Sequence, residues 1–160
     1  MEIEKKISQI EPWFDEAEAN AVYDYMNSGG WVMEFKKTEE LERMICEFTG
    51  AKYCVMTNNG TISLTLAMLA LGLKPWDEIL VPNFTMIASP NSAKLIGVEP
   101  VLVDVDTETL CIDLDAAARA ITPKTKVLMY VAFNGRSGDM NMVVDFCKKH
   151  NLFLIEDAAQ

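Results

Sequence analysis

From residue 52 onward, short apolar runs alternate with longer segments whose apolar residues recur every three or four positions. Several of the short runs are apolar at consecutive positions, which is typical of strands covered on both faces. This alternation predicts parallel strands joined by crossover helices, and therefore an α/β fold with three αβα layers around a mostly parallel central sheet. The five expected strands are residues 53–56, 78–81, 100–103, 126–131 and 152–155.

Helix-like periodicity fills the stretches between these strands. In the last of them, Asp139 stands at the N-cap position, and Lys148, Lys149 and His150 lie where the helix dipole favours positive charge. His150 is therefore interpreted as a helix-end charge and not as a catalytic group. The expected helices are residues 61–73, about 86–96, 114–121 and 140–150.

Two more helices are expected ahead of the α/β pattern. Pro12 starts the first, Gly29 and Gly30 end it, and the second runs from about residue 38 to residue 49. No linker separates them from the rest, so residues 1–160 are expected to form one domain, with a helical segment at 1–50 and an α/β part at 51–160. The second helix has an apolar stripe that is expected to face a core, consisting of Leu41, Met44, Ile45 and Phe48.

The chain carries 14 basic and 24 acidic side chains, for a formal net charge of -10. This charge opposes nucleic acid or an anionic membrane surface as a partner. Four cysteines without C-x-x-C spacing and one histidine argue against a metal site, and the cysteines are interpreted as reduced core residues. The N-terminus does not resemble a signal peptide and no apolar run reaches about 20 residues, so the expected location is the cytoplasm.

Ligands of parallel α/β sheets bind beyond the carboxyl ends of the strands, so residues that follow the apolar runs are the candidates for chemistry. Gly60 and Thr61 follow the first run and open a long apolar helix. Their backbone N–H groups, the threonine hydroxyl and the helix dipole suit a phosphate. The segment is neither a G-x-G-x-x-G nor a Walker motif, and a structural capped turn remains an equal alternative.

Asp157 follows the last apolar run and brings a carboxylate to the same expected edge of the sheet. By itself, an acid at this position could simply cap a following helix. Combined with an upstream phosphate-binding turn, it suits pyridoxal 5'-phosphate (PLP), whose pyridinium nitrogen requires an anion to stay protonated. Gly60 and Asp157 together therefore predict a PLP site.

With these features in place, the sequence resembles the DegT/DnrJ/EryC1/StrS sugar aminotransferases, PLP-dependent enzymes of the aspartate aminotransferase fold (fold type I). The resemblance spans nearly the whole chain and implies that it forms the N-terminal part of the large domain of such an enzyme. Six segments in the order found in the family carry it: SGGW at 28–31, NGT at 59–61, PNFTM at 82–86, VDVD at 103–106, AITPKTK at 120–126 and IEDAAQ at 155–160.

The resemblance also implies roles for individual residues. Gly60 and Thr61 would hold the cofactor phosphate, Asp157 would pair with the pyridine nitrogen, and Gln160 would reach the 3'-oxygen. Met86 matches a position where relatives often place an aromatic residue over the pyridine ring, so a thioether would pack there instead. Trp31 lies in a segment that approaches the sugar nucleotide in relatives, and a packing anchor is the alternative.

Transamination further requires a lysine that forms a Schiff base with the cofactor, and none of the lysines in this sequence is suitably placed. In relatives this lysine comes after the segment that matches residues 156–160. The chain also stops just past a buried strand, so we expect it to be an N-terminal fragment, inactive alone, with no catalytic residue of its own.

The expected activity of the intact enzyme is transfer of an amino group from an amino-acid donor to a nucleotide-linked keto sugar. Two alternatives remain open. Some relatives replace the lysine with histidine and act as sugar dehydratases, and a non-catalytic module could bind a phosphorylated ligand or form an assembly interface. Family sites are completed across a homodimer, so self-association is also expected.

Overall fold

The computed structural model describes residues 11–31, 33 and 35–160. Contacts within the chain divide it into two units, one ending at Met56 and the other spanning Thr57–Gln160. The described part of the first unit contains two helices, α1 (Glu16–Asn27) and α2 (Lys36–Thr49). The second unit contains the sheet and the helices that cover it.

Helix α1 begins four residues after Pro12, at a reciprocal cap. The Asp15 carboxylate accepts the Ala17 N–H at 2.7 Å, and the Glu18 carboxylate accepts the Asp15 N–H at 2.9 Å. This capping box satisfies two of the otherwise unpaired donors at the helix start. The helix therefore begins where side-chain acceptors are available, and Pro12 lies ahead of it.

The apolar stripe of α2 is not covered within the first unit as described, so its contact with a core stays a prediction. Leu41, Met44 and Phe48 are 42%, 53% and 93% exposed, and neither α1 nor α2 has a buried residue. An amphipathic pattern identifies the apolar face of a helix but does not specify what covers it.

Residues 53–56 do not form the predicted strand. Tyr53 and Val55 are 76% and 74% exposed, and the Met56 N–H donates at 2.7 Å to the carboxylate of Glu42 on α2. An apolar run becomes a strand only where a neighbouring strand supplies hydrogen-bonding partners. Here a helix side chain takes the place of that partner.

The other four predicted strands are confirmed within one or two residues at each end. They are β1 (Glu78–Pro82), β2 (Glu99–Val103), β3 (Thr125–Val131) and β4 (Phe153–Asp157). All pair in parallel, in the order β2-β1-β3-β4. In this register Leu80 of β1 lies between Val101 of β2 and Leu128 of β3.

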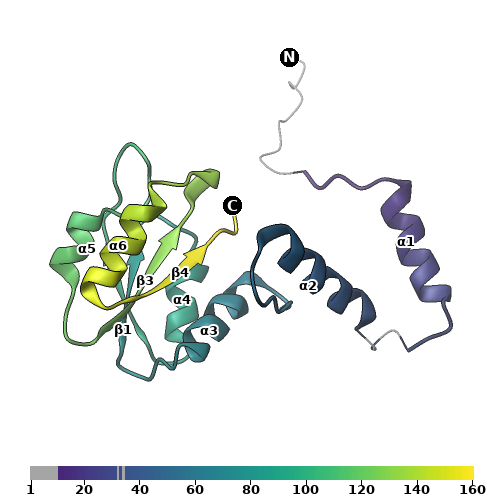
Figure 1. Cartoon of the computed structure of the whole chain (residues 1–160), viewed down its shortest axis with the longest axis horizontal. Coiled ribbons are helices and arrows are strands. Elements are labelled where there is room, and N and C mark those ends of the chain that lie inside the picture. Colours follow the sequence, from purple (N-terminus) through teal and green to yellow (C-terminus); the bar gives the residue numbers. More distant parts are fainter. Residues whose placement is uncertain (1–10, 32, 34) are drawn as a thin grey trace, which may run out of the picture. The chain divides into compact units, whose positions relative to one another are not determined.

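The sheet is covered on both faces, which confirms the three-layer αβα architecture. Figure 1 shows it between α3 (Gly60–Ala70) and α4 (Ala88–Lys94) on one side and α5 (Leu114–Ala120) and α6 (Met140–His150) on the other. Successive strand residues point to opposite faces. Ile79 and Val81 therefore join the core under α3 and α4, whereas Leu80 joins the core under α5 and α6.

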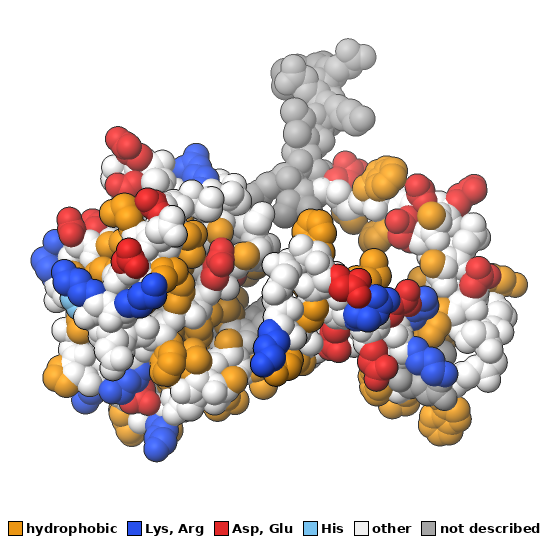
Figure 2. Space-filling model, in the orientation of Figure 1, with side chains coloured by type: hydrophobic (Ala, Val, Ile, Leu, Met, Phe, Trp, Pro, Cys, Tyr) orange, Lys and Arg blue, Asp and Glu red, His pale blue; other side chains and the backbone are white. Residues whose placement is uncertain are grey.

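Charged side chains of both signs are interspersed on the visible face of the unit that holds the sheet (Figure 2). In the part of the chain that the structure describes, no helix combines the length and the apolar character that crossing a bilayer demands.

The N-cap of α6 provides a test of local stability. The Asp139 carboxylate accepts the N–H groups of Asn141 and Met142 at 2.9 and 3.3 Å. We expect Asp139→Ala to lower the free energy of unfolding by about 1 kcal/mol, because two N–H groups of the first turn lose their acceptor. Urea unfolding measures this loss. Asp145→Ala in the same helix is the control, and an equal loss there would contradict the cap.

Candidate functional site

The carboxyl ends of the four strands lie at one edge of the sheet, because all of them run in parallel. β1 continues into α4 on one face, whereas β3 continues through the 3-10 turn Phe133–Gly135 into α6 on the other face. Chains leaving neighbouring strands toward opposite faces open a crevice, where α/β proteins bind ligands. A ligand site is therefore expected at the carboxyl ends of β1 and β3.

The first turn of α3 presents unpaired backbone donors. Asn59 caps it: its side-chain oxygen accepts the Ile62 N–H at 3.0 Å, and its carbonyl accepts the Ser63 N–H at 3.1 Å. The N–H groups of Gly60 and Thr61 have no acceptor among the described residues. A Cβ built on Gly60 would have no atom within 4 Å, so the space in front of this turn is open to an anion.

The start of α3 points toward the carboxyl edge of the sheet. After α3 the chain passes through residues 71–77 directly into the start of β1, so the end of α3 lies at the opposite, amino edge. α3 packs on α4 and β4, and the Thr65 hydroxyl on α3 donates to the Ser92 carbonyl on α4 at 3.0 Å. Gly60 and Thr61 therefore lie at the same edge as the carboxyl end of β4.

Asp157 is the last residue of β4, and its half-buried carboxylate is held by two hydrogen bonds. The Ser89 hydroxyl donates to Oδ2 at 2.9 Å, and the Ala159 N–H donates to Oδ1 at 3.2 Å. The Asp157 carbonyl also accepts the Ala132 N–H at 3.0 Å, which ties β4 to the loop after β3. The structure thus fixes a carboxylate at the predicted edge.

Ser89, which is fully buried on α4, was not among the residues predicted from the sequence. Its hydroxyl also lies 3.0 Å from that of Thr85. In the sequence, Thr85 and Ser89 stand four residues apart after the PNF turn. In a helical turn this spacing places two hydroxyls side by side, which could have indicated that they act together. An ordinary serine in an apolar segment does not reveal by itself which strand end it faces.

The loop after β3 engages Gln160. The Gln160 side-chain oxygen accepts the Asn134 N–H at 2.8 Å, which leaves the amide NH₂ as a donor. Phe133 of the same loop stacks on Phe84 after β1, with ring centroids 4.6 Å apart. The structure therefore joins the ends of β1, β3 and β4 through side chains. The contact of Gln160 with a cofactor oxygen stays a prediction.

The remaining predicted site residues, Met86 and Trp31, have exposed side chains. Met86, between β1 and α4, is 65% exposed, so its thioether is available to pack on a ligand. Trp31 follows α1 in the first unit and is 77% exposed. Arg136, to which sequence analysis assigned no role, donates to the Glu108 carbonyl at 3.4 Å. The roles predicted for Met86 and Trp31 stay predictions.

Three described titratable groups of the second unit have shifted pKa values, and in one of them burial raises the pKa of the Cys147 thiol on α6. Hydrogen bonds from the Thr109 N–H and hydroxyl lower the pKa of the Asp106 carboxyl in the turn after β2. Burial raises the pKa of the Tyr130 phenol, which accepts the Gly138 N–H at 2.6 Å. Asp106 and Tyr130 thus hold loops in place, and neither is hydrogen-bonded to the Asp157 carboxylate.

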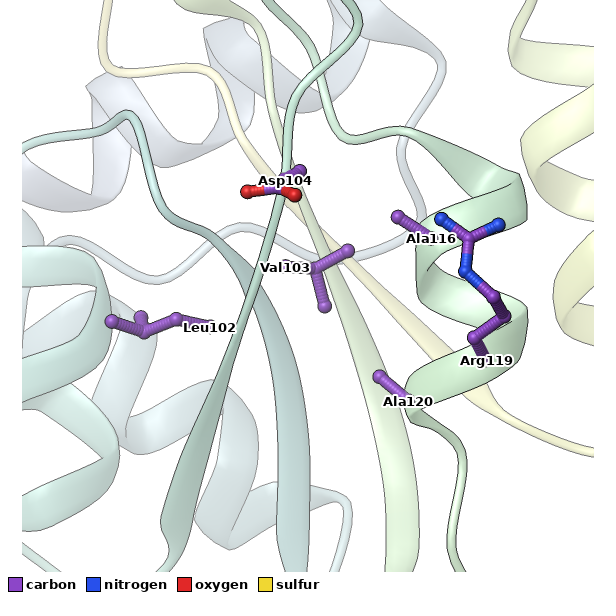
Figure 3. A pocket seen from close by; sticks show the side chains of 6 residues that line it. All are labelled: Leu102, Val103, Asp104, Ala116, Arg119 and Ala120. Atoms are coloured by element: carbon purple, nitrogen blue, oxygen red, sulfur yellow. The ribbon is translucent and has the colours of Figure 1, made fainter.

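A surface hollow of about 250 Å³ lies between β2 and α5. Figure 3 shows Val103 pointing toward α5 and Leu102 pointing away from it, with Asp104 at the end of the strand and Arg119 on the helix. Asp104 accepts a hydrogen bond from the Asn83 amide at 2.6 Å. The hollow includes none of the predicted site residues, so we place the candidate site at the ends of β1, β3 and β4.

Comparison with known proteins agrees with the resemblance in the sequence. Residues 12–160 match the model of the DegT/DnrJ/EryC1/StrS aminotransferase family. The chain is 38% identical over 156 residues to a GDP-perosamine synthase of Caulobacter vibrioides, covering 97% of this chain and 42% of that protein. It is 40% identical over 121 residues to a UDP-2-acetamido-2-deoxy-3-oxo-D-glucuronate aminotransferase of Pseudomonas aeruginosa, covering 76% of this chain and 34% of that protein.

Solved structures give the same picture. NtdA of Bacillus subtilis, determined with the cofactor PMP bound, superposes with a TM-score of 0.84 at 28% identity. The match covers 98% of this chain and 38% of that structure. The chain thus spans well under half the length of these relatives, and the part it matches adopts their fold.

Proposed function

The chain belongs to the DegT/DnrJ/EryC1/StrS aminotransferase family, and we propose that it supplies the cofactor-binding part of a PLP-dependent sugar aminotransferase. One observation carries the proposal: the open, unpaired N–H groups at the start of α3 share a sheet edge with the Asp157 carboxylate. A phosphate donor site and an anion at the same edge match the two charged ends of PLP.

The residues present fit PLP at both ends. Gly60 and Thr61 would bind the phosphate through two N–H groups, the Thr61 hydroxyl and the positive end of the α3 dipole. Asp157 would bind the protonated ring nitrogen, and the Gln160 NH₂ would donate to the ring oxygen. When bound, PLP serves as an electron sink for the bond-breaking step at the substrate carbon. These residues would hold the cofactor, orient it and keep its ring charged.

The relatives' names extend the proposal to substrates. They describe aminotransferases of GDP- and UDP-linked sugars, so we propose a nucleotide-linked keto sugar as acceptor and an amino acid as donor. Trp31 and Met86 offer exposed surfaces on which a sugar nucleotide and the pyridine ring could pack. We further propose a cytoplasmic homodimer as the working form.

Gly60→Asp tests the phosphate site. Position 60 has room for a side chain, and an acid in the first turn of a helix is favourable, so the variant should fold at least as well as the wild type. Its carboxylate would occupy the position of the phosphate and repel it. We expect at least a tenfold loss of PLP affinity, measured by fluorescence titration of the 160-residue chain.

Gly60→Asn is the matched control, because it has nearly the same shape without the charge. We expect it to weaken PLP binding less than Gly60→Asp, with the difference shrinking at high salt. Equal affinities for the wild type and Gly60→Asp, or no saturable PLP binding to the wild type, would contradict the proposed function.

A further inference from the structure

Among the hydroxyl groups that the structure describes, that of Ser89 is the one that contacts the Asp157 carboxylate. It has no exposed surface, and its Oγ lies 2.9 Å from Asp157 Oδ2 and 3.0 Å from Thr85 Oγ1. Ser89 is 68 residues from Asp157 in the sequence, on a helix that covers the opposite end of the sheet order from β4. The buried Ser89 hydroxyl therefore links α4 to the end of β4 through one hydrogen bond.

The direction of the hydrogen bonds follows from the number of protons. A carboxylate can only accept, so the single proton of the Ser89 hydroxyl is donated to Asp157. The Thr85 hydroxyl must then donate its own proton to Ser89 Oγ. The order Thr85 to Ser89 to Asp157 is thereby fixed, and each donor polarises the next.

We propose that Ser89 is a positioning residue that keeps the Asp157 carboxylate aimed at the pyridine nitrogen of the cofactor. The inference rests on the proposed function. A carboxylate held facing the ring nitrogen stabilises the protonated form of that nitrogen by its charge. Because Ser89 occupies Oδ2 and the Ala159 N–H occupies Oδ1, the carboxylate cannot rotate without losing both bonds.

Ser92 provides a matched control on the same helix. It is also a fully buried serine, but its hydroxyl donates to the Ser89 carbonyl at 2.7 Å and does not contact Asp157. Ser92→Ala removes the same atom from an equally buried place. Any general effect of a lost hydroxyl on the stability of α4 should therefore appear in both variants.

The test uses the 160-residue chain with PLP labelled with ¹⁵N in the ring, whose nitrogen resonance reports ring protonation. In Ser89→Ala we expect this resonance to move toward that of an unprotonated pyridine and PLP affinity to fall about tenfold, as for loss of a hydrogen bond to a charged group. Ser92→Ala and Ser89→Thr, which keeps the hydroxyl, should retain the wild-type resonance. An unchanged resonance in Ser89→Ala over the whole pH range would overturn the inference.

Two further measurements separate this inference from the proposed function. If Asp157→Asn moves the ring resonance and Ser89→Ala does not, only the role of Ser89 fails. If Asp157→Asn leaves it unmoved, the proposed function fails. Without cofactor, the ¹³Cγ resonance of Asp157 should shift in Ser89→Ala and not in Ser92→Ala, and absence of that shift contradicts the inference independently of PLP.

Discussion

Replacing Leu80 with alanine is expected to lower the free energy of unfolding by about 2 to 5 kcal/mol. Leu80 lies in the middle of β1 with no exposed surface and packs in the core under α5 and α6. Leu128 of β3 and Val101 of β2 flank it on either side. Close packing of this kind does not fully collapse around a missing side chain, so the loss includes both apolar burial and a residual cavity.

Chemical denaturation monitored by circular dichroism measures this loss. Leu102→Ala on β2 is the control, because Leu102 is 60% exposed and the same atoms are removed from a place that is mostly solvated. We expect the control to lose less than half as much stability. Similar losses for the two variants would show that the sheet is not the cooperative core of the second unit.

Asp157→Asn is expected to weaken PLP binding about ten- to a hundredfold. The amide has the shape of the carboxylate but no charge, so a protonated ring nitrogen would lose its counter-ion in a half-buried place. The amide oxygen can still accept the Ala159 N–H, and the amide NH₂ can donate to Ser89 Oγ if the Ser89 hydroxyl then donates to Thr85, so the surrounding bonds stay largely intact. The effect should therefore appear in affinity and not in folding.

Fluorescence titration with PLP, alongside thermal unfolding without it, measures both quantities. Glu156→Gln is the control, because it removes an exposed carboxylate one residue away that points to the other side of the strand. We expect the control to bind PLP as the wild type does. Wild-type affinity in Asp157→Asn would contradict the assignment of the ring end of the site.

The parts of the fold that were predictable from the sequence are those with the strongest burial. β1 and β3 are buried on both faces, so their apolar runs are nearly uninterrupted, and Asp139 marks the start of α6 by its own hydrogen bonds. Residues 53–56 carry the same kind of pattern without a partner strand, and the stripe of α2 has no cover among the described residues. The sequence of a segment indicates whether it prefers to be buried, but the segment that covers it is determined by the whole fold.

The candidate site divides in a similar way. Asp157 was predictable because it ends an apolar strand at the carboxyl edge of the sheet, whereas Gly60 was predictable from the long apolar helix that it opens, since residues 53–56 form no strand. Ser89 was not predictable, because its importance depends on which strand end α4 faces. The link between Gln160 and Asn134 was also hidden, since it joins a side chain to a backbone N–H 26 residues away.

The first turn of α3 and the end of β4 come from opposite ends of the second unit, and every strand must be in place before they share an edge. A molecule held by both would close a very long loop of chain and would associate only with fully assembled protein. Its binding free energy would then add to the stability of the whole sheet and grow with ligand concentration. Cofactor supply would thus set how long the folded chain survives proteolysis.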